Sequence, residues 1–136
     1  EMTSSLVGSE MCIRDRHIYQ HGIRSGERTE FAFAKEHTVM TPFSLDGIDS
    51  MVADLKGKNV YLTIDMDVLD PSEFPGTGTP EAGGTRYTEL LAALMKMKGL
   101  NIVGADMNEL SPPYDPSGIS TALCCKLLRE LLLMLS

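Results

Sequence analysis

Two aspartates separated by one residue are the side chains of this sequence best suited to chemistry. Residues 61–64 are typical of a buried strand, and Asp65 and Asp67 follow directly. Side chains alternate along a strand, so both carboxylates point the same way, about 6–7 Å apart along the backbone. Carboxylate oxygens are preferred ligands of Mg²⁺, Mn²⁺ and Ca²⁺. Asp65 and Asp67 are therefore candidate metal ligands, suited to a pair of cations about 3.5–4 Å apart as in two-metal hydrolases.

A segment rich in proline and glycine follows, and we call residues 69–84, LDPSEFPGTGTPEAGG, the Pro/Gly loop. Glycine permits tight bends, while proline limits the entropy lost on ordering. We expect this loop to form one wall of a pocket. Asp70, immediately before Pro71, is expected to order the turn through backbone hydrogen bonds rather than to bind metal.

A second acidic cluster, NIVGADMNELSPPYD, spans residues 101–115. Glu109 comes after another strand pattern, where a carboxylate can bind a planar guanidinium through two parallel hydrogen bonds. We expect Asp106 to be structural and to align the neighbouring loop.

Strand and helix patterns alternate from residue 17 onward and must position these side chains. Strands are predicted over residues 17–23, 38–40, 59–65 and 101–107, and helices over 27–36, 45–55, 88–98 and from Ser117 or Ser120 onward. This alternation favours a parallel sheet covered on both faces, a three-layer αβα sandwich. Ligands of such sheets bind beyond the carboxyl ends of the strands, where Asp65, Asp67 and Glu109 lie. Only four strands are predicted, so we expect an incomplete domain with exposed sheet edges.

Composition limits the possible partners. The chain has 136 residues, 43% of them hydrophobic, which suits one small domain. Its formal charge of -7 argues against nucleic acid and anionic membranes and suits a small cationic molecule. The apolar segment 119–136 is interrupted by charged residues, which predicts a core helix rather than a membrane anchor. Three cysteines without a disulfide or zinc pattern predict reduced thiols in a cytoplasmic protein.

Two further expectations concern the start of the chain and the histidines. Residues 1–16 show no regular periodicity and are similar to translated adaptor sequence, so we expect an irregular, foreign lead-in, with the domain beginning at residue 17. His17, His21 and His37 lack a neighbouring acid and nucleophile and are expected to be structural or exposed.

Three segments together resemble the C-terminal half of the ureohydrolase family of arginases and agmatinases. They are GIRSGERTEFAFAKE, YLTIDMDVLDPSEFPGTGTPEAGG and NIVGADMNELSPPYD, and the ending Pro113-Tyr114-Asp115 is more like that of agmatinases. The resemblance covers residues 17–136. It implies the ureohydrolase fold, two Mn²⁺ ions with Asp65 and Asp67 among their ligands, and a guanidinium substrate contacted by Glu109. It also implies a homo-oligomer, a trimer or hexamer, for a full-length protein.

The family's GGDH and DAHxD motifs, which carry its other metal ligands, do not occur in this sequence. A full-length relative would hydrolyse agmatine to putrescine and urea with water activated by the paired manganese ions. We assign no catalytic side chain within this chain. We expect the isolated chain to bind Mn²⁺ weakly and to turn over nothing.

The residues also leave two other classes of protein open. IDMDV resembles the first motif of haloacid-dehalogenase-like phosphatases, in which Asp65 would be the nucleophile of a Mg²⁺-dependent reaction, although PGTGTP has no place in that pattern. A non-catalytic binding or assembly module is the second alternative.

Overall fold

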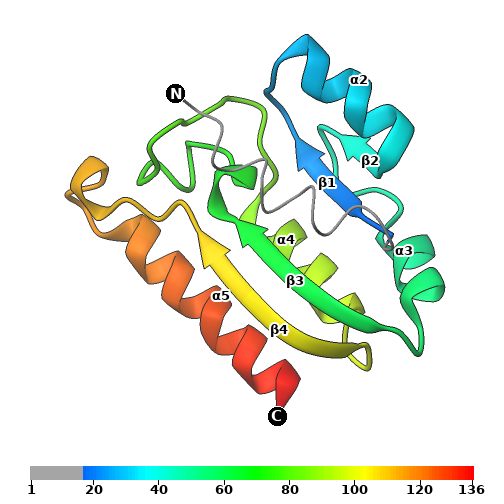
Figure 1. Cartoon of the computed structure of the whole chain (residues 1–136). Coiled ribbons are helices and arrows are strands. Elements are labelled where there is room, and N and C mark those ends of the chain that lie inside the picture. The colour runs from blue at the N-terminus through cyan, green and yellow to red at the C-terminus, as the bar shows by residue number, and fades with distance from the viewer. Residues whose placement is uncertain (1–16) are drawn as a thin grey trace.

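The computed structural model describes residues 17–136, so the predicted foreign lead-in at residues 1–16 lies outside the described residues and stays a prediction. The regular elements of the described residues are shown in Figure 1. They are β1 (Tyr19–Ile23), α2 (Arg28–His37), β2 (Val39–Pro42), α3 (Ile48–Leu55), β3 (Asn59–Asp65), η1 (Met66–Val68), α4 (Tyr87–Lys96), β4 (Asn101–Asn108), η2 (Pro112–Tyr114) and α5 (Ile119–Leu135).

The four strands are parallel, which confirms the predicted α/β class. They form two hydrogen-bonded pairs, β1 with β2 and β3 with β4. Within residues 17–136 no backbone ladder joins β1 to β3, so the strands do not make one continuous sheet. The end of β1 instead meets the β3 pair through close packing, because a Cβ atom on Gly22 would lie 2.6 Å from Val68 Cγ2.

The main core lies between the β3–β4 pair and helices α4 and α5. Alternate β3 residues such as Ile64 point into it, whereas Tyr61 on the opposite face is 64% exposed. Helix α4 lies behind this strand pair in Figure 1 and packs against α3 and α5. The buried residues of this core are Ile64, Met66, Leu69, Phe74, Leu90, Leu94, Leu127 and Leu131. The exposed opposite face fits the predicted incomplete domain.

Helices α2 and α4 begin within one residue of the prediction, whereas the starts of α5 and α3 need correction. Helix α5 starts at Ile119, after Gly118 in a left-handed conformation with φ 75°, so neither Ser117 nor Ser120 is its N-cap residue. The carboxylate of Asp115 instead accepts a hydrogen bond from the Ser120 N–H at 2.7 Å, which satisfies a free donor of the first turn. Helix α3 begins at Ile48, three residues later than predicted. Among the described helices, none is both long and apolar enough to cross a bilayer.

Candidate metal centre

The two candidate metal ligands stand on a sharp turn at the end of β3, and we call residues 65–68 the aspartate turn. Asp65 ends the strand, and its Oδ1 atom accepts a hydrogen bond from the Asp67 N–H at 2.9 Å. Met66 between them is fully buried and fixes the turn to the core. Asp65 is exposed and Asp67 half-buried, so both carboxylates can reach a ligand.

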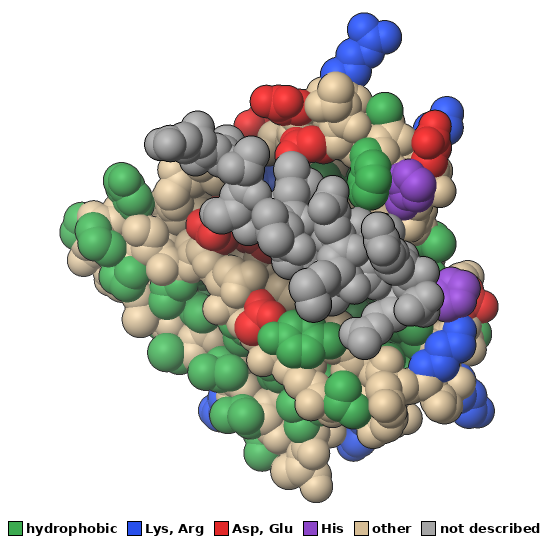
Figure 2. All heavy atoms as spheres, in the orientation of Figure 1, with side chains coloured by type: hydrophobic (Ala, Val, Ile, Leu, Met, Phe, Trp, Pro, Cys, Tyr) green, Lys and Arg blue, Asp and Glu red, His purple; other side chains and the backbone are tan. Residues whose placement is uncertain are grey.

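Three acids interact electrostatically at this edge of the molecule. Desolvation by neighbouring atoms is the main cause that raises the pKa of Asp65, and the charges of Asp67 and Glu109 act in the same direction. The backbone N–H of Asp67 and the charge of Arg24 oppose the rise in pKa. A bound cation would relieve this repulsion between carboxylates. On the face shown in Figure 2, acidic side chains occur near the middle, while basic ones lie mainly at the periphery.

Two threonines of the Pro/Gly loop hold the Asp67 carboxylate. Thr77 Oγ1 donates a hydrogen bond to Asp67 Oδ1, and Thr79 Oγ1 donates to Oδ2 at 2.8 Å. Thr77 is only 2% exposed, so its hydroxyl is buried beside the carboxylate. The sequence predicts that this loop forms one wall of a pocket, but it does not predict either hydrogen bond to Asp67. The signal was present in Thr-Gly-Thr, where alternate residues both carry a hydroxyl donor.

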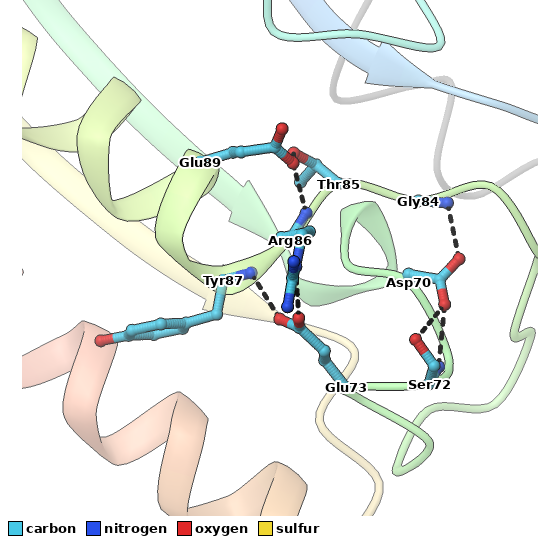
Figure 3. A network of polar contacts seen from close by, with 8 residues as sticks. All are labelled: Asp70, Ser72, Glu73, Gly84, Thr85, Arg86, Tyr87 and Glu89. Atoms are coloured by element: carbon cyan, nitrogen blue, oxygen red, sulfur yellow. Dashed lines mark hydrogen bonds and ion pairs between the residues drawn. The ribbon is translucent and has the colours of Figure 1, made fainter.

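Asp70 orders the loop as predicted. Its carboxylate accepts hydrogen bonds from the Ser72 N–H at 2.9 Å and from the N–H groups of Gly83 and Gly84 at 2.9 and 3.1 Å. The Ser72 hydroxyl and these N–H groups lower the pKa of Asp70 to about 2. Gly84 is required here, because a Cβ atom would lie 2.4 Å from the Asp70 backbone nitrogen. Figure 3 shows Asp70 with Ser72 and Gly84.

Glu73, in the first part of the Pro/Gly loop, is tied to the start of α4, as Figure 3 also shows. Glu73 accepts hydrogen bonds from Arg86 Nε and from the Tyr87 N–H, both at 2.8 Å. Glu89 closes a capping box by accepting from the Arg86 N–H at 2.7 Å, and it also accepts from the Thr85 hydroxyl at 3.0 Å. The loop therefore enters α4 in a defined direction.

The middle of the loop is attached to the segment that follows β4. The Gly76 N–H donates to Ser120 Oγ at 2.8 Å, and the Gly76 carbonyl accepts from the Ser111 N–H at 2.7 Å. A Cβ atom at Gly76 would lie 2.7 Å from the Cβ of Ser120. The Pro/Gly loop and the second acidic cluster, residues 101–115, are thus in direct contact.

Glu109 lies at the end of β4, next to the aspartate turn. Strand register pairs Asp65 with Asn108, the residue before Glu109. Glu109 is exposed and has φ 65°, a left-handed conformation that costs a non-glycine residue free energy. The fold thus holds this carboxylate in an uncommon backbone geometry. Asp106 accepts a hydrogen bond from the Thr63 hydroxyl at 2.8 Å, so it joins β4 to β3 rather than aligning the loop.

The carboxylates suit one side of a site for a hard divalent cation. Asp65 and Asp67 supply oxygen ligands with the required charge. Among residues 17–136, no group of three or more His, Cys, Asp or Glu side chains could hold a metal ion. Within this described part of the chain, His17, His21 and His37 therefore join no such group with the aspartates. The donors therefore match such a cation in type, and further ligands are needed to complete its coordination.

Comparisons with known proteins identify the family of this chain. The profile of the Arginase family matches residues 2–134. The agmatinase of Halalkalibacterium halodurans is 44% identical over 133 residues, which cover 95% of this chain and 44% of that protein. The agmatinase of Bacillus anthracis is 42% identical, over 94% of this chain and 43% of that protein. The chain therefore belongs to the arginase family.

Solved structures show the same relationship at the level of the fold. An agmatinase-like protein from Clostridium difficile superposes with a TM-score of 0.89 at 49% identity, over 98% of this chain and 50% of that one. The arginase of Bacillus caldovelox superposes with a TM-score of 0.74 at 27% identity, over 85% of this chain and 42% of that one. The chain is thus a partial ureohydrolase domain and spans less than half the length of the curated agmatinases above. The family match begins inside residues 1–16, the segment predicted from sequence to be foreign.

Proposed function

We propose that this chain supplies one side of the active site of an agmatinase-like ureohydrolase, which converts agmatine and water to putrescine and urea. The observation that carries the proposal is the position of Asp65, Asp67 and Glu109 at the ends of two paired strands, in a chain of the arginase family. The relatives that are 42–44% identical are agmatinases, which favours agmatine over arginine as the substrate.

The residues divide into two roles. Asp65 and Asp67 would bind the paired manganese ions, which supply an activated water when bound. Thr77 and Thr79 hold the Asp67 carboxylate in one orientation, so less freedom is lost on metal binding. Glu109 would accept two hydrogen bonds from the planar guanidinium and orient its carbon toward the metal centre. The net charge of -7 also favours the approach of a cationic substrate.

Membership of the arginase family leaves the phosphatase alternative without support. The Pro/Gly loop, which has no place in the phosphatase pattern, is bonded directly to Asp67. A non-catalytic module of the same family is the remaining rival, and activity measurements separate it from an enzyme.

The purified chain tests the metal part of this proposal. Titration with Mn²⁺, followed by electron paramagnetic resonance, should show weak binding that is lost when Asp65→Asn and Asp67→Asn are combined. Asp49→Asn is a matched control, because Asp49 forms an exposed surface ion pair with Lys96. We expect no urea from agmatine, because the described residues carry too few metal ligands. Robust urea release by the purified chain would contradict the expected inactivity, and Mn²⁺ binding unaffected by the double substitution would contradict the ligand assignment.

A further inference from the structure

Arg24 connects the first strand pair to the candidate metal centre. It stands directly after β1, and its half-buried side chain crosses to the aspartate turn. Its Nη1 atom donates to the Val68 carbonyl at 2.9 Å, and Nη2 donates to the carbonyls of Asp67 and, at 2.9 Å, Glu81. All three acceptors are carbonyl oxygens of the backbone, so the guanidinium of Arg24 binds the main chain and, among residues 17–136, no side chain.

The three carbonyls belong to two separate stretches of chain. Asp67 and Val68 lie in the aspartate turn, and Glu81 lies in the returning part of the Pro/Gly loop. One planar guanidinium therefore fastens the aspartate turn to the returning part of the Pro/Gly loop. Arginine suits this role because its rigid fork presents several N–H donors in fixed directions, whereas lysine carries a single compact ammonium group.

Backbone packing brings β1 close enough for this contact. Gly22 has φ 77°, and any side chain there would collide with Val68. Because no backbone ladder joins β1 to β3 within residues 17–136, the contacts of Gly22 and Arg24 fix the aspartate turn relative to the first strand pair.

We propose that Arg24 is a positioning residue of the metal centre: its guanidinium clamps the aspartate turn to the Pro/Gly loop and so sets the direction of the Asp67 carboxylate. This inference rests on the proposed function, because it assigns Asp67 as a metal ligand. Arg24 touches neither substrate nor metal in this role and acts through Asp67 and the loop threonines.

The test compares Arg24→Ala, Arg24→Lys and Arg28→Ala in the full chain. Arg28 is an exposed arginine at the start of α2, so its substitution removes the same charge without touching the loop. Amide hydrogen exchange should speed up at residues 65–68 and 81–85 in both Arg24 variants, and remain unchanged in α5 and in Arg28→Ala. The affinity for Mn²⁺ should fall about 10- to 100-fold in Arg24→Ala, the usual range for residues that orient a metal ligand.

The outcomes separate the clamp from the proposed function. If amide hydrogen exchange at residues 65–68 and 81–85 is unchanged in Arg24→Ala, Arg24 does not hold the aspartate turn against the Pro/Gly loop, and the proposal is overturned. Faster exchange throughout the chain, α5 included, overturns it in favour of a general structural role. Full recovery of Mn²⁺ affinity in Arg24→Lys also overturns it, because charge alone would then suffice. If the unsubstituted chain binds no Mn²⁺, the metal part of both proposals is overturned, and the exchange data still decide whether Arg24 holds the loop.

Discussion

The buried hydroxyl of Thr77 donates a hydrogen bond to the carboxylate of Asp67, ten residues earlier in the chain. This bond joins the Pro/Gly loop to the aspartate turn at a candidate metal ligand. Thr79 bonds the other carboxylate oxygen. The loop therefore holds the carboxylate of a candidate metal ligand from both sides.

Thr77→Val should weaken Mn²⁺ binding by the purified chain about tenfold, because valine keeps the shape of threonine and removes the donor that orients Asp67. Loss of one buried hydrogen bond should also lower the free energy of unfolding by about 1 kcal/mol. Thr77→Ser should retain most of the affinity, and Thr88→Val, at an exposed position of α4, should change neither quantity. Equal Mn²⁺ affinities for Thr77→Val and the unsubstituted chain would rule out this role.

Gly84→Ala should destabilise the chain by about 1–3 kcal/mol, because the added methyl group meets the Asp70 backbone. Gly78→Ala is the matched control in the same loop, since a Cβ atom there has no neighbour within 4 Å. Urea denaturation measures both values. A loss in Gly78→Ala as large as that in Gly84→Ala would show that the loop is not held by this close approach.

Glu109→Gly should raise the free energy of unfolding by about 0.5–1 kcal/mol, because glycine adopts the left-handed conformation without a steric penalty. Glu81→Gly should lower the free energy of unfolding, because Glu81 has no positive φ and glycine only adds freedom to the unfolded chain. Urea denaturation of the two variants tests the difference in sign. A destabilised Glu109→Gly variant would mean that the Glu109 backbone is not strained.

Asp70 should make the chain sensitive to acid. Hydrogen bonds from the Ser72 hydroxyl and from three backbone N–H groups hold its folded-state pKa at about 2, below the unfolded value of 3.8. Its stabilising contribution is therefore complete above about pH 4 and is lost as the pH falls through about 2. Asp70→Asn should cost most stability at neutral pH, and its difference from the unsubstituted chain should shrink toward pH 2.

Urea denaturation at several pH values measures that difference. Asp49→Asn, at an exposed surface ion pair, serves as the control. A difference between Asp70→Asn and the unsubstituted chain that stays constant from pH 7 to pH 2 would contradict the lowered pKa.

Local sequence patterns predicted the elements well where the pattern itself decides the structure. The predicted strand 59–65 coincides with β3, because apolar alternation and the following aspartates define both its ends. The N-terminus of α5 was misplaced because the capping carboxylate belongs to Asp115, upstream of the serines that a local pattern favours.

Long-range contacts explain what sequence reasoning missed at the site. Asp65, Asp67 and Glu109 were found because each lies at or just beyond the end of a strand, and parallel strands end at the same edge. Arg24 binds carbonyls more than 40 residues away, so its partners follow from the fold alone. Pairing between strands is equally non-local, which is why a single sheet was predicted where the described residues form two pairs.

The most direct test of the central claim is urea release from agmatine by a graft. In this graft, residues 17–136 replace the matching part of the Halalkalibacterium halodurans agmatinase, which is 44% identical and supplies the remaining half of the domain. We expect Mn²⁺-dependent urea release by the graft, and a fall of at least about 100-fold when Asp65→Asn and Asp67→Asn are combined. A folded graft that binds Mn²⁺ and releases no urea, or that stays active without both aspartates, would contradict it.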